Sequence, residues 1–238
     1  MRNERNEPVG ILGGIGPMAT VYFMQRVLDL TDASRDQDHL DMLVWNHASI
    51  PDRTAYLLGD SDESPGPVMA DDARQLERAG ARFIAVPCNT AVAFQDEIAS
   101  AVDIPVLSIV DETVAAAQAA VPGLTSVGIL ATDGTLRAET YHRTARAAGL
   151  TPVVPDDVVQ KDVMSMIYDG VKAGMPVERD RFDAAVAHLR AKGAGAVMLA
   201  CTELSILKTD LAVDEPDVVD SLDALAARTV TMAGGRLR

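Results

Sequence analysis

Two cysteines are the residues of this sequence whose positions most clearly suggest chemistry. Cys88 and Cys201 are the chain's two cysteines, and each follows a short, mostly apolar run, Ala81–Pro87 or Ala194–Ala200. Such runs are typical of strands buried on both faces of a parallel sheet. Parallel α/β sheets bind ligands beyond the C-terminal ends of their strands. The sequence therefore predicts that both thiols lie at ligand-binding strand ends and are not merely small buried residues.

Two thiols on opposite sides of a small ligand can act as a base and an acid. One thiolate removes a proton from one face of a carbon, and the opposite thiol delivers a proton to the other face, which inverts the carbon. A free thiol has a pKa of about 8.5, so a modest decrease gives a useful thiolate near neutral pH. We expect helix N-termini after the two strands to supply that decrease, and the thiols to titrate as a coupled pair.

The elements that must position these thiols occur twice in the chain. Three segments recur in the same order: Val9–Leu12 as Val127–Leu130, Gly80–Cys88 as Gly193–Cys201 and, more loosely, Val106–Ile109 as Val218–Ser221. Helical patterns lie between them, at Ala70–Ala79, Asp111–Val121 and Asp183–Lys192. Alternating strands and helices predict a doubly wound α/β architecture.

The repeat predicts two pseudo-symmetric α/β lobes, each with a doubly wound parallel sheet, and an active site in the cleft between them. The first lobe is expected to comprise residues 1–115 and the second residues 116–220. The closing helix, about residues 221–238, is expected to return to the first lobe. If the lobes face each other across a pseudo-twofold axis, Cys88 and Cys201 face each other across the cleft.

Small polar residues follow each cysteine: Asn89 and Thr90 in the first half, Thr202 and Glu203 in the second. Asn and Thr side chains often cap the helix that follows them. They can also bind a substrate carboxylate together with backbone N–H groups at a helix N-terminus. Both roles are compatible, and the sequence leaves both open.

Composition limits the classes of partner. The net charge of −14 disfavours nonspecific binding to nucleic acid or to an anionic membrane, because both would repel the chain. The segment Met1–Pro8 is polar, and no apolar run approaches the length of a membrane span. We therefore expect a cytoplasmic protein with reduced cysteines. No sequence pattern indicates a metal or a cofactor.

Several motifs together resemble the aspartate/glutamate racemase family that works without pyridoxal phosphate, and most closely its aspartate racemases. The central motifs are Cys88-Asn89-Thr90-Ala91 and Ala200-Cys201-Thr202-Glu203. The others are residues 13–20 with Met18, 35–39, 51–56 with Asp52 and Arg53, 131–135 with Thr132, and 160–164 with Lys161. They run from residue 9 to about residue 225, nearly the whole chain.

The resemblance implies an amino-acid racemase that interconverts L- and D-aspartate, or a close acidic analogue, as a homodimer. It implies that Cys88 and Cys201 are the catalytic pair and that Arg53 and Lys161 bind carboxylates. We also expect substrate contacts from Met18, Asn89, Thr90 and Thr202. Supporting roles are expected for Asp52, Glu203 and Thr132. Asp52 could orient Arg53 or cap a turn, and Glu203 could tune Cys201 or pair with a helix end.

One departure from the family pattern bears on the substrate. In aspartate racemases a histidine commonly follows the Cys-Asn-Thr-Ala run, but this chain has Val92. The glutamate racemases also lack that histidine, so aspartate, glutamate or another amino acid stays open as the substrate.

Three other classes of function compete with racemisation. A related cysteine-dependent isomerase or decarboxylase of small diacids, or a noncatalytic protein that binds acidic metabolites, would keep a similar cleft. The run Gly14-Ile15-Gly16-Pro17-Met18-Ala19 also fits a dinucleotide-binding turn. The acidic residues at the required distance, Asp36 and Asp38, precede the predicted second strand, Met42–Trp45, which disfavours that interpretation.

Overall fold

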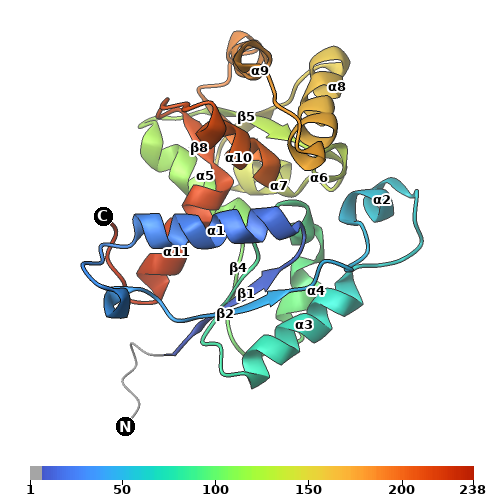
Figure 1. Ribbon diagram of the computed structural model, residues 1–238. Helices are drawn as coiled ribbons and strands as arrows, with labels where there is room; N and C mark the ends of the chain where they lie inside the picture. The colour runs from blue at the N-terminus through green and yellow to red at the C-terminus, as the bar shows by residue number, and fades with distance from the viewer. Residues whose placement is uncertain (1–6) are drawn as a thin grey trace. The chain divides into compact units, whose positions relative to one another are not determined.

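The chain forms two compact units. The structure is a computed structural model that describes residues 7–238 (Figure 1). One unit contains the chain up to Ile109 together with Leu222–Arg238, and the other contains Val110–Ser221. The chain passes between the units within two helices, α5 (Ile109–Ala120) and α11 (Ser221–Met232).

The first unit is built on a four-stranded parallel sheet with the order β2-β1-β3-β4. Its strands are β1 (Val9–Gly13), β2 (Met42–Asn46), β3 (Ile84–Ala85) and β4 (Val106–Leu107). All five residues of β1 are buried, as expected for a strand covered on both faces. The strand β2 lies at the edge of the sheet, and its last three residues are exposed.

Helices cover both faces of this sheet. The helices are α1 (Pro17–Leu30), α2 (Arg53–Leu58), α3 (Gly66–Arg78) and α4 (Gln95–Ala99), with 3-10 turns at Asp36–Asp38 and Thr90–Phe94. Figure 1 shows α1 and α3 on opposite sides of β1 and β2. The helix α3 begins four residues before the predicted start at Ala70, because Pro67 is tolerated in a first turn, where its missing N–H breaks no bond.

The second unit repeats this sheet in its own elements. The order is β6-β5-β7-β8, all parallel. The strands are β5 (Ser126–Ala131), β6 (Thr151–Val153), β7 (Ala196–Ala200) and β8 (Val218–Asp220). Since the two orders correspond strand for strand, the prediction of two doubly wound α/β sheets is confirmed.

The helices of the second unit pack around that sheet. Besides α5 they are α6 (Asp133–Arg137), α7 (Thr140–Ala147), α8 (Asp157–Ser165), α9 (Arg179–Ala191) and α10 (Thr202–Asp210). A π-helical segment, Met166–Gly170, and a 3-10 turn, Val171–Ala173, continue from α8. Apolar residues of α8, α9 and β7 form one buried cluster that includes Val163, Val186 and Leu199.

Each sheet has one point where its strand order changes direction. From the first strand of each unit the chain crosses to one side, and it then returns to place the third strand on the other side. Ligands of open α/β sheets bind at such a point, beyond the C-terminal ends of the two central strands. In the first unit these strands are β1 and β3, and in the second they are β5 and β7.

Among residues 7–238, no helix is both long enough and apolar enough to cross a membrane.

Candidate active site

Cys88 lies beyond the end of β3, at the switch point of the first sheet. The N–H of Cys88 donates a hydrogen bond to the carbonyl oxygen of Val86 over 2.8 Å, which turns the chain sharply at Pro87. The residue is 6% exposed. A five-residue 3-10 turn, Thr90–Phe94, follows it. The α-helix expected directly after Cys88 is therefore absent from this described segment, because the chain forms a tighter turn there.

The residues after Cys88 are held close to the sheet. Asn89 is 3% exposed and its side chain forms no capping bond to the turn that it precedes, while Thr90 is half-buried. Of the two roles that the sequence leaves open for Asn89, the structure does not show capping of this turn. The ring of Phe94 packs against Tyr56 of α2, with 5.7 Å between the ring centres. This contact brings the Cys88 segment and the helix that begins with Arg53 together in one unit.

Arg53 is a cation fixed by backbone oxygens. Its Nη1 donates to the carbonyl oxygens of Ile50 and Pro51, over 3.2 Å and 2.9 Å, and its buried Nε has no partner. No ion pair joins Arg53 to any carboxylate among residues 7–238. The neighbouring Asp52 caps α2 by accepting a hydrogen bond from the N–H of Ala55 over 2.9 Å. Of the two roles expected for Asp52, the structure shows capping.

Two glycines at the turn between β1 and α1 have a packing role. Gly14 has a φ of +92°, and a Cβ on it would lie 2.3 Å from the backbone carbon of His47. A Cβ on Gly13 would lie 2.4 Å from the methyl group of Thr20. Backbone conformation and close packing thus account for these glycines without a dinucleotide. Met18, which follows in the first turn of α1, is 70% exposed.

Cys201 follows β7 directly and lies at the switch point of the second sheet. It is the N-cap residue of α10, and its carbonyl oxygen accepts hydrogen bonds from the N–H groups of Leu204 and Ser205. Its side chain is buried, with the residue 6% exposed. Ala131 and Ala200, the last residues of β5 and β7, are partners in the strand register. Thr132 and Cys201 therefore begin neighbouring turns at the same sheet edge.

Thr132 caps α6. Its hydroxyl accepts a hydrogen bond from the N–H of Thr135 over 3.2 Å and lies 3.1 Å from the hydroxyl of Thr135. The residue is buried, and it follows β5, the strand that pairs with β7 next to Cys201.

Glu203 binds the Cys201 thiol. The Sγ atom of Cys201 donates to Oε2 of Glu203 over 3.0 Å, and the hydroxyl of Thr202 donates to the same oxygen over 3.1 Å. Thr202 is the first residue of α10, and it binds Glu203 through its hydroxyl. The other oxygen, Oε1, accepts from Nζ of Lys172 over 2.8 Å. Of the two roles expected for Glu203, contact with Cys201 is the one that the structure shows.

This environment disfavours the Cys201 thiolate. Burial raises the pKa of Cys201 well above its ordinary value, and the nearby Glu203 carboxylate raises it further. The effect expected from the helix N-terminus is therefore wrong for this residue, because burial and a neighbouring anion outweigh the helix dipole. Burial also acts to raise the pKa of Glu203, but the Lys172 ammonium and the thiol hydrogen bond outweigh it and lower that pKa.

Lys172 belongs to this group, although no sequence pattern predicted it. It lies in the 3-10 turn after the π-helical segment, between Gly170 and Gly174, and its Nζ is also 5.4 Å from the ring centre of Tyr168. The one sequence feature that could have indicated this residue is its position between Gly170 and Gly174 in a mostly apolar segment. Nothing in the spacing connects it to Glu203, 31 residues later.

Lys161 lies on α8, which is fixed to the end of β5. Its neighbour Gln160 donates to the carbonyl oxygen of Ala131 over 3.0 Å and to Oδ1 of Asp133 over 2.8 Å. Lys161 itself is exposed and pairs with no carboxylate of residues 7–238. Gln160 thus holds the first half of α8 at the sheet edge that carries Cys201.

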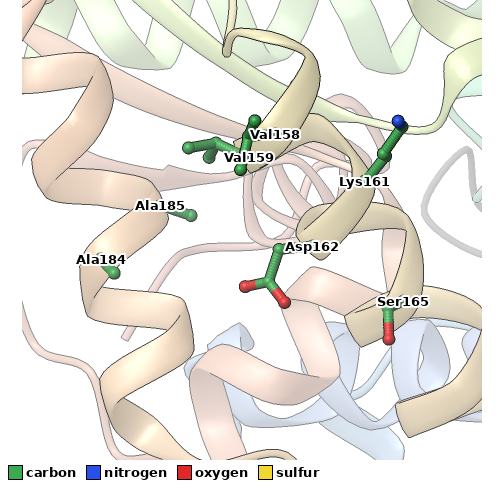
Figure 2. A pocket seen from close by; sticks show the side chains of 7 residues that line it. All are labelled: Val158, Val159, Lys161, Asp162, Ser165, Ala184 and Ala185. Carbon is green, nitrogen blue, oxygen red and sulfur yellow. The ribbon is translucent and has the colours of Figure 1, made fainter.

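Figure 2 shows a pocket of about 610 Å³ between α8 and α9. The residues that line it are Val158, Val159, Lys161, Asp162, Ser165, Ala184 and Ala185. The Asp162 carboxylate points toward α9, where it pairs with Arg181, whereas Lys161 points away from Ala184 and Ala185. The Lys161 ammonium is therefore directed away from this mainly apolar pocket.

A second polar group, which no sequence pattern predicted, lies at the end of β2. The buried carboxylate of Asp72 on α3 accepts a hydrogen bond from Nε1 of Trp45 over 2.9 Å, and its other oxygen lies 2.8 Å from Nδ1 of His47. These contacts hold the loop that runs from β2 to Arg53. No set of three His, Cys, Asp or Glu side chains within residues 7–238 is placed to hold a metal ion.

Comparisons with known proteins agree with this architecture. The family model described as Asp/Glu/Hydantoin racemase matches residues 12–229. The broad specificity amino-acid racemase RacX of Bacillus subtilis is 30% identical over 94% of this chain and 96% of its own length. A glutamate racemase of Deinococcus radiodurans is 27% identical over 97% of this chain and 77% of its own length.

A solved structure extends the similarity to the fold. The aspartate racemase of Picrophilus torridus superposes with a TM-score of 0.80 and 30% sequence identity, covering 98% of this chain and 96% of its own. With the family model spanning nearly the whole described chain, this chain belongs to the Asp/Glu/hydantoin racemase family.

Proposed function

We propose that this protein is a cofactor-independent amino-acid racemase that interconverts L- and D-aspartate, or a close acidic analogue, with Cys88 and Cys201 as its two proton-transferring groups. The observation that carries the proposal is the equivalent placement of the two cysteines. Each one follows the third strand of its own sheet and lies at the switch point of that sheet.

The reaction needs two proton transfers at one carbon. In one direction the Cys88 thiolate takes the α-proton, so a S–H bond forms as the Cα–H bond breaks. The Cys201 thiol then gives its proton to the opposite face of Cα and becomes a thiolate. The substrate gains as many protons as it loses, and the two thiols exchange protonation states. The reverse direction exchanges their roles.

Two cations without carboxylate partners among residues 7–238 support an acidic substrate. Arg53 presents a guanidinium held only by backbone carbonyls, and Lys161 presents an unpaired ammonium on α8. A guanidinium can bind a carboxylate through two parallel hydrogen bonds, and an ammonium supplies a compact charge. We assign the substrate carboxylates to these two residues, and contacts with the α-carboxylate and the amine to Asn89, Thr90 and Thr202. Met18 is also assigned to substrate binding.

A broader substrate range is the second candidate. Val92 occupies the position where aspartate racemases commonly have histidine, so this chain lacks one polar group near Cys88. The similarity to a broad specificity amino-acid racemase makes neutral amino acids worth testing beside the acidic ones.

The test is α-proton exchange in heavy water, followed by NMR, with chiral chromatography of the same samples. The panel contains L-aspartate, L-glutamate and several neutral amino acids. Exchange with inversion of aspartate is expected for the wild-type protein. Cys88→Ser and Cys201→Ser should each lose inversion while circular dichroism shows an intact fold.

Other outcomes would contradict parts of the proposal. Full racemisation by either serine variant would overturn the two-thiol mechanism. No exchange with any amino acid would favour a diacid isomerase, a decarboxylase or a binding protein, whose products or bound ligands can be sought in the same samples. The expected homodimer stays a prediction, and light scattering after size-exclusion chromatography tests it.

A further inference from the structure

A side-chain amide joins the first half of α8 to the end of β5. Nε2 of Gln160 donates to the carbonyl oxygen of Ala131, the last residue of β5, and to Oδ1 of Asp133, the first residue of α6. Because both partners are acceptors, only the Nε2 end of the amide can face them, which fixes its orientation. Oε1, at the other end, is buried and has no hydrogen-bond partner among residues 7–238. The two bonds to the end of β5 therefore determine where this side chain lies.

A second side chain of α8 contacts the same turn. The N–H of Asp133 donates to Sδ of Met164 over 3.3 Å. Gln160 and Met164 are four residues apart, so they lie on one face of the helix. Asp133 is thus bound twice, through its carboxylate by Gln160 and through its N–H by Met164. We call Gln160, Met164 and Asp133 the α8 latch.

The opposite face of α8 is joined to α9. The Asp162 carboxylate pairs with Arg181 and points toward α9 (Figure 2). A helix turns about 100° per residue, so Asp162 lies roughly opposite Gln160, and Lys161 lies between the two faces. Rotation of α8 about its axis would break the contacts on both faces. These contacts therefore fix the direction in which Lys161 leaves the helix.

The position of the Lys161 ammonium depends on this support. An ammonium is a compact charge on a flexible four-carbon stem. Lys161 is exposed, and none of the ion pairs within residues 7–238 involves it. Its reach is therefore set by the place of its backbone. Gln160 binds that backbone to Ala131, whose register partner Ala200 immediately precedes Cys201.

We propose that Gln160 is a positioning residue that, with Met164 and Asp133, directs the Lys161 ammonium toward the substrate carboxylate at the ends of β5 and β7. This inference rests on the proposed function, in which Lys161 binds a carboxylate. Gln160 contacts no substrate in this assignment and acts only through Lys161. Loss of its amide should therefore weaken the binding of acidic substrates and leave the proton transfers largely unchanged.

The first test is a double-mutant cycle on KM for aspartate. Gln160→Leu keeps an apolar side chain in place and removes the donor. It should raise KM at least about fivefold, a coupling typical of residues in contact, with a smaller change in kcat. Lys161→Met should raise KM further. Because Gln160 acts through Lys161, the double variant should have the same KM as Lys161→Met alone.

Two outcomes of this cycle would overturn the proposal. An unchanged KM for Gln160→Leu would show that the latch has no effect on the substrate. A KM in the double variant equal to the product of the two single effects would show that Gln160 and Lys161 act independently.

Gln118→Leu is the matched control. Nε2 of Gln118 donates to the carbonyl oxygen of Ala148, so this amide also joins two elements of the second unit, α5 and the end of α7. Gln118→Leu should leave KM unchanged. An equal rise in KM would attribute the effect to general loosening of the unit and would contradict the assignment to the latch.

The second test follows α8 without relying on activity. Amide hydrogen exchange, measured by mass spectrometry of peptides that cover Asp157–Ser165, reports local opening of this helix. Gln160→Leu should speed exchange there at least about tenfold, whereas Lys161→Met and Gln118→Leu should not. Unchanged exchange in folded Gln160→Leu protein would show that the amide does not hold α8, and the proposal would fail.

The two tests also separate this inference from the racemase assignment. If Gln160→Leu speeds exchange in α8 but the wild-type protein racemises no amino acid, the proposed function fails and the attachment of α8 by Gln160 stands. If the protein racemises aspartate and Gln160→Leu changes neither KM nor exchange, the inference fails and the function stands.

Discussion

Cys201 donates a hydrogen bond from its thiol to the carboxylate of Glu203, two residues further along the same turn, over 3.0 Å. The equivalent cysteine of the first unit, Cys88, has a threonine at that position. Two sheets with the same strand order thus surround their cysteines with different chemistry. The difference lies in the first residues after the strand, where the fold leaves side chains free to vary.

Alkaline pH should destabilise the protein through two buried acids of the second unit. Burial raises the pKa values of both Cys201 and Tyr141, so the folded state keeps protons that the unfolded chain releases. Their contribution to stability is complete below the unfolded pKa values, about 8.5 for the thiol and about 10 for the phenol, and decreases as pH rises above them. Each group should lower the free energy of unfolding by about 1.4 kcal/mol per pH unit.

Urea unfolding between pH 8 and pH 11 measures this slope. Tyr141→Phe and Cys201→Ala should each remove one group's share, and Tyr56→Phe, which changes a tyrosine of the first unit, is the matched control. If the free energy of unfolding of Tyr141→Phe fell with pH as steeply as that of the wild-type protein, ionisation of Tyr141 in the unfolded chain would not explain the pH dependence.

Replacing Arg53 should weaken substrate binding more than it slows chemistry. Arg53→Gln removes the guanidinium that faces no carboxylate of the described chain, and a lost charge-assisted contact costs about 2 kcal/mol or more. KM for aspartate should rise at least thirtyfold, with a smaller change in kcat. Arg53→Lys should recover only part of the loss, because an ammonium cannot form both parallel bonds.

Steady-state kinetics with aspartate and with a neutral amino acid check this assignment. A neutral substrate that lacks the side-chain carboxylate should be less affected if Arg53 binds that carboxylate. Equal losses for both substrates would instead place Arg53 against the α-carboxylate. An unchanged KM for both would remove Arg53 from the site.

Asp72 should stabilise the loop between β2 and α2. Asp72→Ala leaves Nε1 of Trp45 and the His47 ring without their acceptor, at a cost of about 1–3 kcal/mol. Trp45 is the chain's single tryptophan, so its fluorescence reports the change directly. Asp71→Ala is the matched control, since Asp71 pairs with Arg74 on the exposed side of the same helix. Similar stability losses in both variants would rule out the buried contact as the cause.

Much of the fold follows from local patterns in the sequence. The runs that end at Cys88 and Cys201 are apolar because parallel strands are covered on both faces, and glycines mark the helix ends before them. The apolar runs and the glycines at the helix ends therefore predict the two sheets. They also predict β2 at residues 42–45, which the structure extends by one residue to Asn46.

The side-chain network of the site depends on contacts that no local pattern encodes. Lys172 reaches Glu203 only because the helical segment after α8 changes from a π-helical to a 3-10 turn near Gly170. A Cβ on Gly170 would lie 2.4 Å from Val177, so this bend depends on packing against a distant residue. Asp72 likewise meets His47 through the approach of α3 to the end of β2.

Replacing Gly14, the residue after β1, tests whether its close contact with the His47 backbone shapes the site. Gly14 and Gly80 have similar positive φ values, +92° and +97°, but only Gly14 lies against other backbone atoms. Gly80→Ala should cost about 1–2 kcal/mol, the strain of a left-handed residue that bears a Cβ. Gly14→Ala adds an overlap with the His47 backbone and should cost at least about 1–3 kcal/mol more, since the loop to Arg53 must move. Thermal unfolding and KM measure both effects, and Gly14→Ala alone should raise KM. Equal stability and equal KM in the two variants would show that the contact with His47 does not shape the site.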